Sequence, residues 1–462
     1  MDITINLAPF FDAAANNPLT VGWFLLIHGG WMPVLVVILS TFWHVRLRNI
    51  RAAYLHHLNY TIFAIDVPKL NEQSTRAVEQ IFAQLAGAFS GVNLIEKYIQ
   101  GKNQESFSFE IVSLGGYIQF LVRTPTHFRD LIEAAIYAQY PDAEITEVED
   151  YTGMIPRQYP SDEFNLWGTE LKLNRKSVYP IRTYPLFEHT LTQKFADPMA
   201  ALLEIMSHMH PGENIWIQWV ITPIGDGWKE KGINEAKKLI GAHVKQAPTL
   251  TARALQPVRI VTGGASEVLL HGLGISPYHV EGAAAKDMPS HIQYLSPGER
   301  AIVEAIEAKI SKVGFHAKCR IIYVAKKEIF DKARGVAGIL GAFSQFSALN
   351  LNSFEPAGKV TTKANYFFTK RRIAKRQKKI ARAFRQRSKE LGWGHGMILN
   401  TEELATVWHF PVAEVKAPLV KMTEAKKGEP PAELPIEIME PAASDAQTSK
   451  IQEAETPENL PV

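Results

Sequence analysis

The sequence predicts an α+β protein in which one N-terminal transmembrane helix is followed by two α/β units, a basic helix and a disordered acidic tail. Three observations support this fold class. An uncharged apolar run lies near the N-terminus, strand-like and helix-like patterns alternate through the middle, and the last ninety residues become strongly charged. A length of 462 residues with 46% hydrophobic content is sufficient for two or three packed domains.

The apolar run lies between Asp12 and Arg46 and contains no Asp, Glu, Lys or Arg. As a helix, residues 21–43 would span about 35 Å, enough for a hydrocarbon core of about 30 Å. Tryptophans stand at both ends of this segment, where indole rings favour the membrane interface, and arginines follow it. The residues expected at the membrane interface are Trp23, Trp43, Arg46, Arg48 and Arg51.

The flanking charges predict an orientation. Asp2 and Asp12 precede the run without any Lys or Arg, whereas the arginines follow it, and basic flanks favour the cytoplasmic side. We therefore expect a single-pass protein of the cytoplasmic membrane, with residues 1–20 outside, 44–59 as a basic juxtamembrane linker, and the bulk of the chain in the cytosol. A cleaved signal peptide and a helix buried in a protein core are the alternatives.

The first α/β unit is expected over residues 60–151. Helical periodicity and strand-like alternation follow one another there in the order βαββαβ, which is typical of a ferredoxin-like domain. The predicted strands are 60–67, 106–112, 117–123 and 143–149, and the predicted helices are 74–89 and 126–140.

A second α/β domain is expected over residues 160–360. Its predicted strands include 166–173, 214–222 and 318–325. Ser296 and Glu299 have the spacing of a capping box, which predicts a helix that begins with Pro297. Between about 242 and 293 the chain is rich in Ala and Gly without a clear period, so this part is expected to be an insertion.

The region 363–411 contains a basic helix. No acid interrupts residues 370–389, and a narrow apolar stripe can dock the helix on the rest of the protein. Its cations are Lys370, Arg371, Arg372, Lys375, Arg376, Lys378, Lys379, Arg382, Arg385, Arg387 and Lys389, and its apolar stripe is Ile373, Ala374, Ile380, Ala381 and Phe384. The following tail, 412–462, is rich in Pro, Glu and Ala and is expected to be disordered.

So dense a positive charge predicts a polyanionic partner, because an unpaired cationic face repels itself. DNA or RNA would bind through its phosphates with a steep salt dependence, and anionic lipid is the rival partner. A solvated face, or a contact with the acidic tail or with another protein, is the third interpretation.

The sequence offers little catalytic chemistry. The single cysteine, Cys319, excludes an intramolecular disulfide and a cysteine-based metal site within one chain. The motifs GxxxxGK[ST], GxSxG and HExxH are absent, and His208 and His210 lie two residues apart, which points them away from each other on a helix. We therefore expect no catalytic residue, no cofactor and no metal.

Several blocks of the sequence resemble one known family. They are SPGERAIVEAIEAKISKVGFHAKCRIIYVA from Ser296, the basic helix, and ILNTEELATVWHFP from Ile398. Together they resemble the N-terminal, non-motor region of TraG/VirD4-like conjugation ATPases of the HerA/FtsK superfamily. The resemblance implies a role beside DNA or protein translocation, although the residues that would form a P-loop motor are not found.

From these observations we expect a non-catalytic, membrane-anchored accessory component of a type IV secretion or conjugation-like DNA translocation system. It would dock a separate P-loop ATPase and could form a homo-oligomer. The alternative is a membrane-tethered nucleic-acid-binding or scaffold protein unrelated to secretion. A third hypothesis is a hydrolase, which would require a pocket in which Ser, His and an acid converge.

Overall fold

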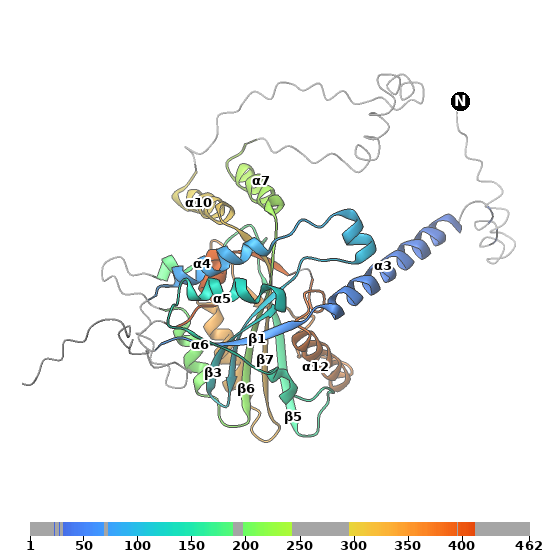
Figure 1. The fold of residues 1–462 in the computed structure, drawn as a ribbon. Helices are drawn as coiled ribbons and strands as arrows, with labels where there is room; N and C mark the ends of the chain where they lie inside the picture. The colour runs from blue at the N-terminus through green and yellow to red at the C-terminus, as the bar shows by residue number, and fades with distance from the viewer. Residues whose placement is uncertain are drawn as a thin grey trace, which may run out of the picture. The chain divides into compact units, whose positions relative to one another are not determined.

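The computed structural model describes Trp23, Ile27 and residues 31–68, 73–187, 197–242, 295–394 and 396–411 (Figure 1). The described residues belong to one compact unit. The predicted N-terminal segment 1–20, all but the first residue of the predicted insertion 242–293, and the predicted acidic tail 412–462 lie outside the described residues.

Within the described ranges, nine strands form a single antiparallel sheet in the order β4-β1-β3-β2-β6-β7-β5-β8, and β9 pairs with β7. The strands are β1 (Tyr60–Asp66), β2 (Phe107–Leu114), β3 (Tyr117–Pro125), β4 (Glu144–Glu147), β5 (Phe164–Leu173), β6 (Glu213–Pro223), β7 (Gly314–Lys326), β8 (Phe354–Pro356) and β9 (Met397–Asn400).

The predicted fold class of two separate α/β units, the first ferredoxin-like, is wrong. Strand β2 pairs with β6 from Phe107, opposite Ile221, to Leu114, opposite Asn214, so the strands of both predicted domains continue into one sheet. Hydrogen bonds along a strand edge join backbone groups that exist in every residue. For this reason the pattern within one strand could not reveal which distant strand completes its edge.

The sheet carries helices on both faces. One face is covered by α4, α5, α6, α11 and α13, and the other by α12 with the turn η5. The helices are α3 (Trp31–His57), α4 (Thr75–Leu85), α5 (Arg129–Tyr137), α6 (Ala200–Ser207), α7 (Lys229–Leu239), α10 (Pro297–Ser311), α11 (Gly338–Ser344), α12 (Thr369–Arg385) and α13 (Thr401–Val407). The short helical turns are η2 (Ala86–Ala88), η3 (Glu96–Gln100), η4 (Thr126–Phe128), η5 (Tyr151–Met154), η6 (Tyr184–Phe187), η7 (Asp226–Trp228) and η9 (Ala333–Ala337).

Apolar residues on both faces of the central strands explain this two-sided packing. In β6, Ile215 and Ile217 enter the core beneath α6 and α11, whereas Trp216 between them enters the core beneath α12. In β7, Tyr323 and Val324 are divided in the same way. Successive side chains of a strand point to opposite faces, so a strand that is apolar throughout must be covered on both.

The predicted fold class also included a transmembrane helix over 21–43, and this part of the prediction is wrong too. Among the helices of the described ranges, none is both long enough and apolar enough to cross a membrane. Residues 31–43 form the first half of α3, and this helix continues through three arginines and the predicted linker to His57. The helix packs on η3, and the Trp43 and Tyr98 rings lie 6.0 Å apart.

The family-like motif at residues 398–411 has a structural role. Asn400 and Glu403 form a capping box at the start of α13, and Glu403 also makes a buried ion pair of 2.9 Å with Lys309 of α10. The Trp408 ring is buried, with its centroid 4.9 Å from that of Phe109. The predicted capping box of Ser296 and Glu299 at α10 is confirmed.

Candidate nucleic-acid interface

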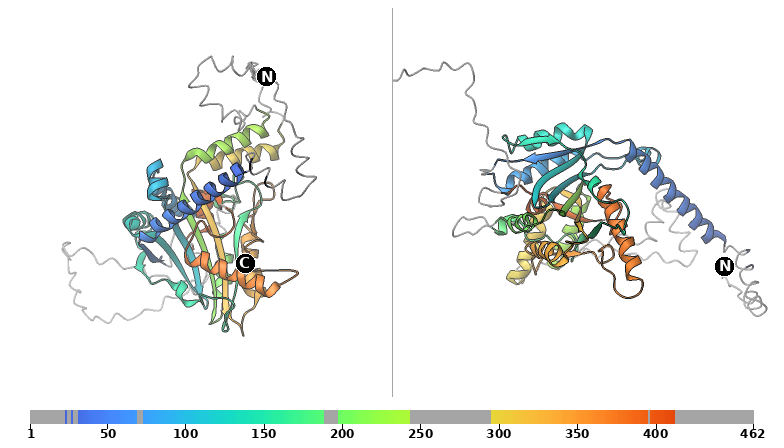
Figure 2. Two further views of the ribbon diagram at one scale, coloured as in Figure 1. Left: turned by 90° about the vertical axis from the view of Figure 1, so that its right-hand side faces the viewer. Right: turned by 90° about the horizontal axis from the view of Figure 1, so that it is seen from below.

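Helix α12 is anchored on the sheet by the apolar face that the sequence predicted. Ile380, Ala381 and Phe384 are buried, and the Phe384 ring lies 5.8 Å from Trp216 of β6. Gly168 of β5 allows the close approach, since a Cβ atom there would lie 3.1 Å from Ile380 Cγ2. The helix therefore stands on the sheet beside β5, at the position seen in Figure 1 and from two further sides in Figure 2.

The opposite face of α12 is cationic and exposed. Within the described ranges, six of its exposed cations form no ion pair with an acid. Such a face raises the local concentration of anions, because no neighbouring carboxylate neutralises it. These six cations are Lys370, Arg371, Lys375, Lys378, Lys379 and Arg382.

Other predicted binding cations have partners within the fold. Arg372 Nη1 donates to the carbonyl of Asn365 at 2.9 Å, and Arg376 Nη1 donates to the carbonyl of Thr361 at 3.0 Å. Arg385 Nη2 donates to the carbonyl of Pro156 at 2.6 Å. These guanidinium groups fasten α12 to the loops on either side of it.

Arg387 is buried beneath the C-terminal end of α12. Its Nε lies 2.8 Å from Glu110 Oε1, and its Nη1 lies 2.7 Å from Asp150 Oδ2. Burial alone would raise the pKa of Glu110, but the charge of Arg387 and the hydrogen bonds donated by Ser108, Tyr151 and Arg387 hold that pKa below its usual value. This arginine therefore acts as a structural cation, and the residues after α12 are fixed to β2 through it.

A second buried pair fixes the same loop to β5 and β7. Arg320 Nε donates to Glu170 Oε1 at 2.8 Å, and Arg320 Nη2 donates to the carbonyls of Ser388 and Leu391. Glu170 also accepts a hydrogen bond from the backbone N–H of Trp393. The loop 386–394 is thus held at several points by groups from the sheet beneath it.

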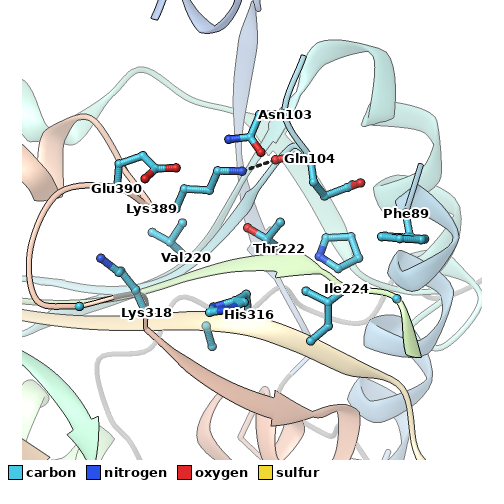
Figure 3. Close-up of a pocket in the computed structure, with 14 residues that line it drawn as sticks. Phe89, Asn103, Gln104, Val220, Thr222, Ile224, His316, Lys318, Lys389 and Glu390 are labelled. Atoms are coloured by element: carbon cyan, nitrogen blue, oxygen red, sulfur yellow. Dashed lines mark hydrogen bonds between the residues drawn. The ribbon is translucent and has the colours of Figure 1, made fainter. Parts of the chain in front are cut away.

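Lys389 lies in a cavity of about 480 Å³ that opens beside this loop (Figure 3). Its Nζ donates to the carbonyl of Gln104, and burial lowers its pKa to about 8. Burial also lowers the pKa of Lys318, which lines the same cavity and donates to the carbonyl of Leu391 at 3.1 Å. The charges of Arg320 and Lys379 lower this pKa further, whereas those of Glu170 and Glu390 raise it.

The loop before α12 presents three adjacent aromatic side chains that the sequence analysis did not single out. Tyr366, Phe367 and Phe368 are 86%, 84% and 74% exposed. Tyr366 and Phe368 have φ angles of 68° and 56°, a region that residues with side chains seldom adopt. The signal in the sequence was a Tyr-Phe-Phe run that fits no core periodicity and stands directly before the cations.

The residues expected at a membrane interface lie on or before α3. Trp23, Trp43, Arg46 and Arg48 are exposed, whereas Arg51 is partly buried near Lys389. The structure thus brings Arg51 close to Lys389, in the loop that follows α12.

Neither the cavity of Figure 3 nor a second cavity beside the start of α12 brings Ser, His and an acid together in its described lining. The residues that line the cavity of Figure 3 include His316, Thr222 and Glu390 without a serine, and the second cavity contains neither histidine nor acid among its described lining. Within the same described ranges, no group of three or more His, Cys, Asp or Glu side chains could hold a metal ion.

A comparison with curated proteins finds no match. A comparison with protein families finds one match, to the family described as a domain of unknown function (DUF8128), over residues 74–423. The match begins just before α4 and extends beyond α13, so it includes most of the sheet and all of α12. Since it covers more than half of the chain, the protein belongs to this domain-of-unknown-function family, DUF8128.

Proposed function

We propose that this protein is a non-catalytic nucleic-acid-binding component that uses the exposed face of α12 to hold DNA or RNA. One observation carries the proposal: six exposed cations share one face of a helix whose other face is fixed to the sheet. A rigid cationic face of this kind can contact successive phosphates, and the counterions that it releases supply most of the affinity.

A role beside a separate translocating ATPase is the wider proposal. It rests on the resemblance of residues 296–325 and 398–411 to the non-motor region of TraG/VirD4-like proteins. Strand β7 and helix α13, which contain much of these blocks, are core elements, so the resemblance concerns the scaffold that carries α12. Recovery of a P-loop ATPase with the tagged protein from its native cells would support this role, and its repeated absence would count against it.

The nucleic-acid proposal is tested by removing charge from α12. Replacing Lys375, Lys378 and Lys379 with Gln should weaken DNA binding by at least about ten-fold at low salt, because three phosphate contacts are lost. The slope of the logarithm of the binding constant against the logarithm of the salt concentration should become shallower by about 2 to 3. Fluorescence anisotropy with the purified full-length chain measures both quantities.

Helix α7 supplies the matched control. Its Lys231, Lys237 and Lys238 are also exposed, and replacing them with Gln changes the net charge by the same amount. If the two triple variants weaken DNA binding equally, only the overall charge matters and the proposed interface is wrong. Unchanged binding in the α12 variant would have the same consequence.

Helix α3 favours a second proposal, attachment to the surface of a membrane that contains anionic lipid. Its consecutive residues 34–39 are all apolar and exposed. Arg46 and Arg48, which follow in the same helix, are exposed as well. Apolar side chains beside arginines are typical of segments that lie at the interface of an anionic bilayer. Flotation with vesicles that contain phosphatidylserine tests this: replacing Leu35, Val36 and Ile38 with Ser should abolish flotation, and persistent flotation would refute it.

A further inference from the structure

The aromatic loop (363–368) is anchored at both of its ends. On the β5 side, the Thr362 N–H donates to the carbonyl of Gly168 at 3.0 Å, and Thr361 Oγ1 lies 2.7 Å from Thr169 Oγ1. On the α12 side, Arg372 donates to the carbonyl of Asn365 and Arg376 donates to the carbonyl of Lys363. The three aromatic residues between these anchors are therefore held outward by a fixed backbone.

Their exposure has no explanation in the packing of the protein. Among the described residues, no ring contact includes Tyr366, Phe367 or Phe368. Large exposed aromatic side chains are unfavourable in water, and non-glycine residues with positive φ add local strain. Both features are expected where a ligand covers the rings, and they occur here directly before the cations of α12.

A cavity of about 640 Å³ lies beside the loop. Its lining residues include Tyr366 of the loop, Trp167, Leu340, Arg372 and Arg376. Flat apolar and cationic surfaces are those on which nucleobases stack, whatever their identity. The cavity is thus suited to a base that is neither paired nor stacked in a duplex.

We propose that the aromatic loop is a stacking platform that makes α12 an interface for single-stranded nucleic acid. Bases stack on Tyr366, Phe367 and Phe368, with one base entering the cavity beside Trp167, while the phosphates follow Lys370, Arg371 and Lys375. In a duplex the bases are already stacked and paired, so the loop adds little there. This inference rests on the proposed function, since the same cations hold the phosphates.

The test compares an oligothymidylate of about 20 nucleotides, which exceeds the site size of one small binding domain, with a duplex of the same length. Replacing Tyr366, Phe367 and Phe368 together with Ala should weaken binding of the single strand by at least about ten-fold. The salt slope should stay unchanged, and duplex binding should change less than about two-fold. Exchanging the rings as Tyr366→Phe, Phe367→Tyr and Phe368→Tyr should preserve single-strand binding.

A second readout does not depend on the folding of the Ala variant. A 2-aminopurine placed in the single strand reports base stacking, so its fluorescence should change when the wild-type protein saturates the strand. Tyr137→Ala, at an exposed aromatic residue of α5, serves as the control and should change neither readout.

The possible results separate the two proposals. If the Lys375, Lys378 and Lys379 variant loses binding but the aromatic variant does not, the nucleic-acid function stands and the stacking platform is refuted. If the wild-type protein binds neither form of DNA, both proposals fail. If the aromatic variant still binds the single strand but no longer floats with phosphatidylserine vesicles, the loop contacts lipid and the inference is overturned. An unchanged 2-aminopurine fluorescence on saturation with the wild-type protein would also overturn it.

Discussion

Removal of Arg387 would show whether this residue holds the fold or contacts a ligand. In the Arg387→Met variant, Glu110 would lose the donors at 2.8 Å and 3.2 Å, and Asp150 those at 2.7 Å and 3.1 Å. Met occupies similar space, and the positive φ of Arg387 is unfavourable for either side chain, so backbone strain does not differ between the two proteins.

The expected loss follows from the burial of Glu110. Its side chain is fully buried, and Ser108, Tyr151 and Gln218 would remain as its donors. Removing one partner of a buried ion pair commonly costs about 3–5 kcal/mol, because the other charge is left without compensation. Part of this loss should return in the Arg387→Met, Glu110→Gln double variant, since no buried charge is then unpaired.

The effect should depend on pH in a defined direction. In the wild-type protein the pKa of Glu110 is held below its usual value, so the pair stabilises the fold above the unfolded pKa and this stability is lost as the pH falls through the folded pKa. In the variant, burial without Arg387 raises that pKa, and the carboxyl group can take up a proton. The stability difference between the two proteins should therefore be larger near pH 7 than near pH 5.

Urea unfolding measures this difference in free energy. Trp216 packs 4.8 Å from Tyr151, close to the pair, so tryptophan fluorescence reports on this core. DNA binding of the folded variant should keep the wild-type salt slope. A loss below about 1 kcal/mol near pH 7, or a loss that does not shrink in acid, would show that Arg387 does not stabilise Glu110 as described.

Four further outcomes test the rest of the fold. Gly168→Val should destabilise the protein by about 1–3 kcal/mol in urea unfolding, because the side chain meets Ile380, and Ile380→Ala should restore part of the loss; an unchanged midpoint would contradict the close approach. Lys309→Met should lower the unfolding temperature strongly, since Glu403 stays buried, and a shift within the error of calorimetry would argue against the pair. Cys319 is buried and its pKa is raised, so a thiol reagent should react with it only during unfolding; rapid labelling of the native protein would disagree. Moderate salt should stabilise the wild-type protein relative to low salt by screening repulsion along α12, and scanning calorimetry should find a smaller gain in the α12 triple variant.

Local patterns predicted the individual elements better than their assembly. The predicted strand 214–222 corresponds to β6, Glu213–Pro223, and the apolar residues Ile380, Ala381 and Phe384 are buried as expected. The edge pairing of β2 with β6 and the short strands β8 and β9 were not predicted. Their stabilising contacts join distant segments through backbone groups, which leave no period in either sequence.

The candidate binding site was likewise predicted only in part. The density of cations identified α12, but it could not distinguish an exposed cation from one whose donors are bonded within the fold. Arg387 and Glu110 are 277 residues apart, and Glu110 occurs within an otherwise strand-like run, so nothing local indicates their pairing. The aromatic residues 366–368 could have been noticed as an apolar run outside any period, but only the structure gives their exposure.

The exposed cations of this region depend on the arginines that are bonded within the fold. An isolated helix with so many like charges would be marginal, because repulsion between neighbours along one face opposes a helix that is already costly to nucleate. Arg372 and Arg376 donate to backbone carbonyls, and Arg387 donates to Glu110 and Asp150, so these arginines fix α12 before any ligand arrives. A helix fixed in this way needs little ordering on binding, and the affinity supplied by exposed cations such as Lys375 and Lys378 is not reduced by that cost. The fastened arginines therefore support binding by fixing the helix and not by holding phosphates, and the two classes can be told apart by whether a substitution changes stability or salt dependence.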